Sequence, residues 1–194
     1  MIYLHGGWPE THSLSEPHRK NGLFEYDKII LALAGSGFEV TSELRGEKNN
    51  PRRYVRTRIL PQIKSLIEKR VPANSITVVG FSKGGFMSLM IASTAKEPGL
   101  NLVSLAGCGT SQFRKIYESF LESDASKMQS RMLSLFDEKD TIGGSCAESK
   151  AKTGKLVFAE EILTTGDGHA TFYAPGDTWI ERVAAWANAA EAAK

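Results

Sequence analysis

The chain has 194 residues, of which 41% are hydrophobic and 24% are charged, and its formal net charge is +2. This apolar fraction excludes an intrinsically disordered chain, and the lack of any fixed-period repeat excludes a solenoid. A mean hydropathy of −0.23 and the lack of an apolar run near ~20 residues predict no membrane span.

Short apolar, β-branched runs alternate with helical patterns along the whole chain. In chain order, the predicted elements are a strand at 1–4, a helix at 24–34, a strand at 38–43, a helix at 52–70, a strand at 75–80, a helix at 83–95, a strand at 101–106, a helix at 112–123, strands at 130–136 and 155–162, and a helix at 178–192. Near-continuous apolar strands suit a parallel sheet covered on both faces. We therefore expect an α/β three-layer sandwich, in which a mostly parallel six-stranded sheet carries helices on both faces, as a single domain over residues 1–194.

Positive charge is concentrated in residues 45–70, which carry nine Lys or Arg residues, Arg45 among them, and two Glu. This stretch has a net charge of +7 and leaves −5 for the rest of the chain. Its apolar residues repeat at helical spacing, so most of the charges fall on the opposite face of the predicted helix, in which Pro61 predicts a kink. The stretch lacks a series of aromatic side chains for base stacking. We expect a solvated helix face and no nucleic-acid partner; the sequence does not indicate an oligomeric state.

Two segments, 8–22 and 140–153, are long, polar and rich in turn residues. Loops of this length are often functional, and 8–22 is a candidate for a short lid. Residues 1–4 lead into a Gly-Gly turn without the basic start and apolar stretch of a secretory signal, which predicts a cytoplasmic location. Cys108 and Cys146 are too few for a disulfide framework or a zinc site, so we expect two free thiols.

The most specific motif is residues 80–84, Gly-Phe-Ser-Lys-Gly, a G-x-S-x-G pattern between a predicted strand and a predicted helix. This setting puts the serine on a tight turn with its hydroxyl clear of the sheet, and the two glycines let the flanking backbone pass without Cβ clashes. The following helix directs its N-terminal amides and dipole at the serine. A phosphate-binding loop is the alternative, but its G-x-x-x-x-G-K-[ST] pattern is missing. Ser82 is therefore the candidate nucleophile.

A nucleophilic serine needs a base, and the chain has four histidines: His5, His12, His18 and His169. His169 lies in a Gly-rich loop between the last predicted strand and the last helix, which can carry it over the carboxyl edge of the sheet. His12 and His18 follow the first strand and could reach the same edge, whereas His5, beside the Gly-Gly turn, is expected to brace that turn. We predict His169 as the base.

The acid that orients the histidine is expected after an intermediate strand, where Asp137 and Asp140 are both available. Asp140 lies past the end of the predicted strand, in a loop that can fold back toward His169, with Ile142 to anchor it. We therefore prefer Asp140 over Asp137. The alternative for either residue taken alone is a plain turn position.

The turn at residues 5–8, His-Gly-Gly-Trp, follows the first predicted strand directly. A glycine turn there can direct a backbone N–H at the negative oxygen that develops when a serine attacks a carbonyl, and the amide of the residue after the nucleophile is the second donor. This pattern predicts Gly7 and Lys83 as the oxyanion donors. An ordinary Gly-Gly turn is the alternative.

Together these motifs resemble those of the α/β-hydrolase superfamily, and the resemblance covers nearly the whole chain. The order Ser82, Asp140, His169 is that superfamily's order of nucleophile, acid and base. The chain is similar to the minimal bacterial lipases, which lack the first two strands of the superfamily. It is also similar to dienelactone-hydrolase-like proteins, although those carry cysteine where this chain has Ser82. No segment is long enough for a large helical cap, and the glycine often found three residues before the acid is missing.

The resemblance implies a serine esterase that cleaves a small-molecule carboxylic ester through an acyl-enzyme, with no metal or organic cofactor. One alternative is a non-catalytic binding module on the same scaffold, whose mark would be a missing member of the triad. Another is an acyltransferase or thioesterase that uses the same triad. The sequence does not specify the acyl group or the alcohol.

Overall fold

The computed structural model describes residues 1–47, 49–110 and 113–191. Within these ranges, six strands pair in parallel in the order β2-β1-β3-β4-β6-β8. The strands are β1 Ile2–Leu4, β2 Thr41–Ser42, β3 Thr77–Phe81, β4 Asn101–Leu105, β6 Ser130–Asp137 and β8 Leu156–Leu163. They correspond to the six strands expected from the sequence, so the predicted parallel sheet is confirmed.

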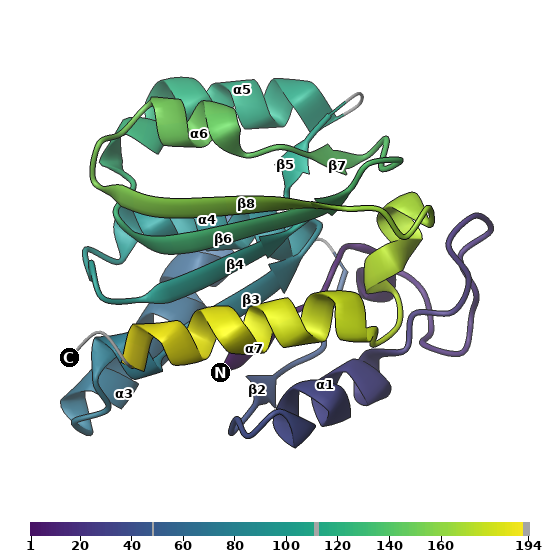
Figure 1. Ribbon diagram of the computed structural model, residues 1–194, viewed down its shortest axis with the longest axis horizontal. Helices are drawn as coiled ribbons and strands as arrows, with labels where there is room; N and C mark the ends of the chain where they lie inside the picture. Colours follow the sequence, from purple (N-terminus) through teal and green to yellow (C-terminus); the bar gives the residue numbers. More distant parts are fainter. Residues whose placement is uncertain (48, 111–112, 192–194) are drawn as a thin grey trace.

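Helices cover both faces of this sheet, with α7 crossing in front of the strands and α4 behind them (Figure 1). In β1, Ile2 and Leu4 belong to one hydrophobic cluster and Tyr3 to another, because successive side chains of a strand point to opposite faces. Helices α3, α4 and α5 complete the first cluster, and α1 and α7 complete the second. The predicted three-layer sandwich is therefore confirmed.

The helices begin and end close to the predicted positions. Their bounds are α1 Tyr26–Gly35, α3 Leu60–Glu68, α4 Lys83–Thr94, α5 Arg114–Ser123 and α7 Asp177–Glu191. Positions 112 and 192, at the ends of two predicted helices, and position 48 in the basic stretch lie outside the described residues. None of the helices in the described part of the chain is long and apolar enough to cross a membrane.

The basic helix is interrupted by a π-helical turn that ends two residues before Pro61, the residue predicted to kink it. Helix α2, Pro51–Tyr54, leads into a π-helical turn at Val55–Ile59 and then into α3, with the Leu60 amide bonded to the Val55 carbonyl five residues earlier. Pro61 has no N–H to donate to the preceding turn, and its ring crowds the carbonyl four residues earlier. We attribute the wider turn to this proline.

The charged face of this helix is solvated, as predicted, except that Arg45 does not belong to it. The arginines within 52–58 are exposed, while Val55, Ile59 and Ile63 are buried. Arg45 precedes the helix and is only 3% exposed. Its Nε lies 3.0 Å from Oε1 of Glu10, which is also buried. The charge of Arg45, which was counted in the basic stretch, is thus buried in the interior.

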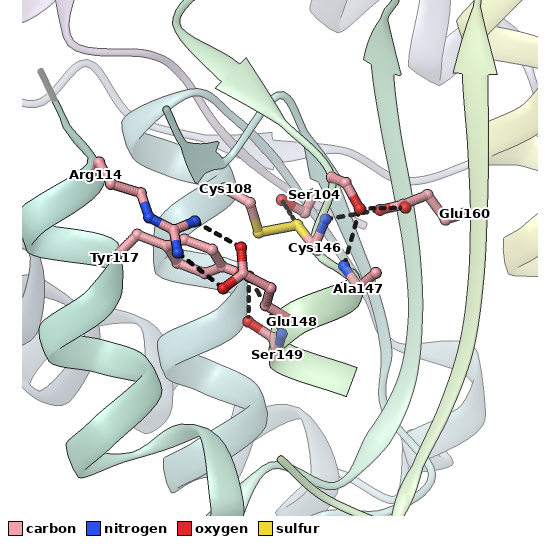
Figure 2. The surroundings of a disulfide bond; sticks show 10 residues. Ser104, Cys108, Arg114, Tyr117, Cys146, Ala147, Glu148, Ser149 and Glu160 are labelled. Atoms are coloured by element: carbon pink, nitrogen blue, oxygen red, sulfur yellow. Dashed lines mark hydrogen bonds and ion pairs between the residues drawn. A yellow bond between two sulfur atoms is a disulfide. The ribbon is translucent and has the colours of Figure 1, made fainter. Parts of the chain in front are cut away.

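The polar segment 140–153 contains structure that the sequence did not predict. Strand β7, Gly143–Gly144, pairs antiparallel with β5, Cys108–Gly109, and the short helix α6, Ala147–Ala151, follows. This pairing brings Cys146 beside Cys108, and the two form a disulfide with a Cα–Cα distance of 5.3 Å (Figure 2). The expectation of two free thiols is wrong, because the pairing of β5 with β7 brings together two cysteines that are 38 positions apart in the sequence.

The disulfide lies in the interior, with both cysteines at most 1% exposed. In the chain-entropy model, cross-linking a loop of this length stabilises the fold by about 4 kcal/mol. Disulfides persist in oxidising compartments and are rare in the cytosol, so this bond does not fit the predicted cytoplasmic location. It ties the chain after β4 to the segment that follows Asp140.

Candidate active site

Ser82 stands at a sharp bend between the end of β3 and the start of α4. Its backbone angles, φ 52° and ψ −113°, lie in the region that side chains other than glycine rarely adopt. A Cβ at Gly80 would lie 2.1 Å from the carbonyl oxygen of Gly84, and one at Gly84 would lie 2.0 Å from that of Leu4. Both positions therefore need glycine, as predicted, because the neighbouring backbone comes too close for a Cβ atom. The strained backbone conformation of the bend is that of Ser82.

The structure brings the Ser82, His169 and Asp140 side chains into one chain of hydrogen bonds. Nε2 of His169 is 3.0 Å from Oγ of Ser82, and Nδ1 is 2.7 Å from Oδ2 of Asp140. The imidazole is 8% exposed and the Asp140 side chain is fully buried. A carboxylate can only accept, so Nδ1 carries the proton and Nε2 is free to accept from the serine hydroxyl.

Main-chain amides hold Asp140 in this orientation. Its Oδ1 accepts the N–H of Ile142 at 2.7 Å and that of Gly143 at 2.9 Å, which leaves Oδ2 for the histidine. Gly143 begins β7, whose partner β5 carries Cys108 of the disulfide. One oxygen of the Asp140 carboxylate is thus bound to the histidine, and the other is bound to main-chain amides next to the β5–β7 pair.

Asp137, the alternative acid, holds the histidine loop from beneath. It is fully buried, and its carboxylate accepts the main-chain N–H groups of Lys139, Thr165, Gly166 and Gly168 and the Thr165 hydroxyl. Burial alone would raise the pKa of Asp137, but these donors outweigh it and hold the pKa below the ordinary value. Sequence reasoning missed this role, because both carboxylates follow the same strand.

We expect Asp137→Asn to lower the free energy of unfolding by about 3 kcal/mol at pH 7, because an amide presents its NH₂ to donors that need an acceptor. The native pKa of Asp137 is lowered, so its stabilisation is complete above the ordinary pKa of 3.8 and is lost as the pH falls through the native value. Urea unfolding of both proteins between pH 7 and pH 2 measures this. A destabilisation that stays constant over that range contradicts the assignment.

The other three histidines have hydrogen-bond partners other than the serine hydroxyl. His5 is buried, and its Nε2 accepts the Arg45 amide at 2.8 Å. Burial and the Arg45 charge lower the pKa of His5 to about 3, so it is neutral and braces the turn, as expected. In the candidate lid segment, the His12 ring stacks on Trp8 at 3.4 Å between centroids, and His18 meets the same indole edge-on.

The predicted oxyanion residues Gly7 and Lys83 lie beside the bend at Ser82. A Cβ at Gly6 would be 3.1 Å from the Phe81 ring and 3.5 Å from Cβ of Ser82, so the glycine turn packs directly on the bend. Gly7 caps the 3₁₀ turn Trp8–Glu10, and Lys83 is the first residue of α4. The amides that begin a helical turn have no partner within it and are available to a ligand.

A cavity of about 390 Å³ opens beside these groups, and Gly7, Ser82 and Lys83 form part of its wall. The rest of the lining is mainly apolar and includes Phe86, Phe113, Ile116, Tyr117 and Ile142. Phe113 and Ile116 are 42% and 56% exposed, so they form the mouth of the cavity. Among the described residues, no three His, Cys, Asp or Glu side chains come together as a metal site.

No protein-family model and no curated protein matches the chain. Several solved structures match it in fold. An esterase/lipase from an uncultured bacterium has a TM-score of 0.67 and 16% identity, over 99% of this chain and 76% of that one. The Pyrococcus furiosus esterase Pf2001 has a TM-score of 0.60 and 15% identity, over 97% and 81%. A lipase-esterase related protein from Clostridium acetobutylicum has a TM-score of 0.60 and 14% identity, over 95% and 93%.

These likenesses cover most of both chains, although few residues are identical. The chain has the α/β-hydrolase fold.

Proposed function

We propose that this protein is a serine esterase that cleaves carboxylic esters through an acyl-enzyme, with Ser82 as nucleophile, His169 as base and Asp140 as acid. The observation that carries the proposal is the continuous pair of hydrogen bonds from Asp140 through His169 to Ser82 at a strained bend. Strained backbone of this kind is kept where the surrounding structure enforces it, typically at functional sites. The esterases and lipases of similar fold support the same class of reaction.

The reaction begins when Oγ of Ser82 bonds to the ester carbonyl carbon while Nε2 of His169 takes the hydroxyl proton. The electron pair of the carbonyl moves to its oxygen, and Asp140 stabilises the imidazolium through Nδ1. When the tetrahedral intermediate collapses, the bond to the alcohol oxygen breaks and His169 protonates that oxygen. Water then attacks the acyl-enzyme by the same steps and releases the acid.

The negative oxygen of each tetrahedral intermediate would rest on the amides of Gly7 and Lys83. Both residues line the cavity together with Ser82, and the N-terminal end of α4 adds its positive dipole end. Each donor of this kind contributes about 3 kcal/mol to the stability of the transition state.

The cavity indicates the chemical class of the substrate. Apart from Lys83, whose ammonium pairs with Glu10, its lining carries mainly aromatic and aliphatic side chains. This lining favours esters with an apolar acyl or alcohol group of small to medium size. Acyl transfer to an alcohol and thioester cleavage use the same intermediate, and product analysis with an added alcohol separates them from hydrolysis. A non-catalytic binding module would not need the hydrogen bonds that reach Ser82.

A fluorophosphonate probe tests the proposal. We expect covalent labelling of the wild-type protein at Ser82, because the base and the oxyanion donors that activate the serine toward esters also act on a phosphonyl centre. Peptide mass spectrometry of the labelled protein locates the modified residue. Ser88, a buried serine of α4, is the matched control, and Ser88→Ala should still be labelled. Label on another residue, or none, contradicts the proposal.

A further inference from the structure

A buried ion pair contacts the glycine turn that precedes Trp8. Nε of Arg45 is 3.0 Å from Oε1 of Glu10, and their side chains are 0% and 6% exposed. Taking two charges out of water costs several kcal/mol for each ion, and a buried pair by itself gives the fold little in return. The reaction proposed above does not use either residue, so the pair calls for another role.

Arg45 holds the carbonyl groups of the turn. Its Nη2 donates to the carbonyl oxygen of His5 and, at 3.2 Å, to that of Gly6. The Gly6 carbonyl also accepts Nδ1–H of His5 at 2.6 Å, a tautomer that follows because Nε2 of His5 accepts the Arg45 amide. The carbonyl between Gly6 and Gly7 is thus held by two donors.

The position of this carbonyl decides the direction of the Gly7 amide. In a trans peptide the C=O of one residue and the N–H of the next lie in one plane and point in opposite directions, and the described residues contain no cis peptide. Since the Gly6 oxygen faces Arg45, the Gly7 N–H points away from Arg45. Gly7 also lines the cavity that contains Ser82, whereas Arg45 is not among the residues of that lining.

Glu10 extends the same network to the second oxyanion residue. Its Oε2 pairs with Nζ of Lys83, which also donates to the Asn49 carbonyl at 2.8 Å. One chain of ionic contacts therefore connects the side chain of Lys83, whose own amide is the second donor, with Arg45. Two cations and one anion leave a charge of +1 behind the two amides, which favours a developing negative oxygen.

We propose that Arg45 and Glu10 are positioning residues that hold the Gly7 and Lys83 amides in the geometry of an oxyanion hole. The inference rests on the esterase function proposed above. Arg45 orients the first donor through the Gly6 carbonyl, and Glu10 fixes Arg45 and the Lys83 side chain relative to each other. An ion pair with a purely structural role would stabilise the turn without changing how strongly the two amides stabilise the negative oxygen of the transition state.

Paired substrates distinguish the two roles: a p-nitrophenyl ester and its thiono analogue, in which C=S replaces the carbonyl. Sulfur is larger and a weaker acceptor, so a well-formed oxyanion hole favours the oxygen ester. We expect Arg45→Met to lower kcat/KM for the oxygen ester by about 10²-fold, as for the loss of one donor, mainly through kcat. The thiono ester should lose less, so the ratio of the two kcat/KM values should fall roughly tenfold.

Two further variants decide the matter if Arg45→Met does not fold. Glu10→Gln combined with Arg45→Met removes both charges of the buried pair. The Lys83 ammonium, whose side chain is 27% exposed, then keeps its hydrogen bond to the Asn49 carbonyl, and the double variant should give the same fall in ratio. Arg45→Lys keeps the charge but cannot reach Glu10 and both carbonyls at once, and an intermediate ratio is expected. Arg58→Met, which removes an exposed ion pair with Glu43, is the matched control and should keep the wild-type ratio.

The outcomes separate this inference from the proposed function. A ratio that falls in the Arg45 variants and not in Arg58→Met supports the positioning role. A wild-type ratio in folded Arg45 variants overturns it, even where their overall activity is reduced, and leaves the esterase assignment intact. A wild-type protein that neither hydrolyses esters nor labels at Ser82 refutes the proposed function itself.

Discussion

Ser82→Ala is expected to lower kcat for a short p-nitrophenyl ester by about 10⁶-fold, the effect found when the serine of such a triad is removed. The alanine has no oxygen to form the acyl-enzyme, while His169 and the apolar cavity remain in place. KM should change little, because the apolar side chains of the cavity lining contribute to binding and the variant leaves them unchanged. Steady-state kinetics with the two purified proteins measure both values.

The same substitution shows whether the serine hydroxyl affects the stability of the strained bend at residue 82. Ser82 adopts φ 52°, and alanine has the same Cβ, so the free energy of unfolding should be nearly unchanged. A folded Ser82→Ala protein that retains wild-type turnover would exclude Ser82 as the nucleophile. An inactive variant that is also largely unfolded calls for Ser82→Gly, which relieves the strained backbone and still lacks the hydroxyl.

Asp140→Asn is expected to lower kcat by up to about 10⁴-fold. The two main-chain amides of Ile142 and Gly143 donate to Oδ1, so the oxygen of an asparagine would be kept at that position. Its NH₂ group would then face Nδ1 of His169 at the place of Oδ2. The imidazole would accept there and carry its proton on Nε2, where it can no longer take a proton from Ser82.

Asp137→Asn makes the same chemical change three residues earlier and is the matched control. Asp137 binds the main chain of the histidine loop and has no part in the hydrogen bonds to the imidazole. We expect this variant to lose stability more than turnover, whereas Asp140→Asn should lose turnover with little change in stability. If kcat falls by orders of magnitude in Asp137→Asn and stays near wild type in Asp140→Asn, the acid is Asp137.

The disulfide between Cys108 and Cys146, which replaces the two expected free thiols, restrains the loop that carries Asp140. The disulfide joins Cys108 and Cys146, 38 positions apart, and so closes a loop that includes β6 and Asp140. Cys108 and Gly143, whose amide binds the carboxylate, both belong to the β5–β7 pair. The cross-link therefore limits the freedom of the loop from which Asp140 approaches the histidine.

Local patterns carried the predictions that the structure confirms. The strands, the helices and the bend at residues 80–84 depend on side chains within a few positions of one another, so their periodicity and their glycines are visible in the sequence. The position of Asp140 past the end of the predicted strand favoured it as the acid, but the pattern assigned no role to Asp137, the last residue of β6. The structure gives each a different partner, the imidazole of His169 or the main chain beneath it.

What the sequence determined by itself is the layered sheet, the bend that exposes Ser82 and the set of residues that could reach it. Only the tertiary structure decided that Arg45 and Glu10, 35 residues apart, meet at the glycine turn, and that the two cysteines bond. Such contacts join loops whose paths depend on the packing of the whole fold. Spacing along the chain reports which face of an element a residue occupies, and it carries no information on which distant loop will lie against that face.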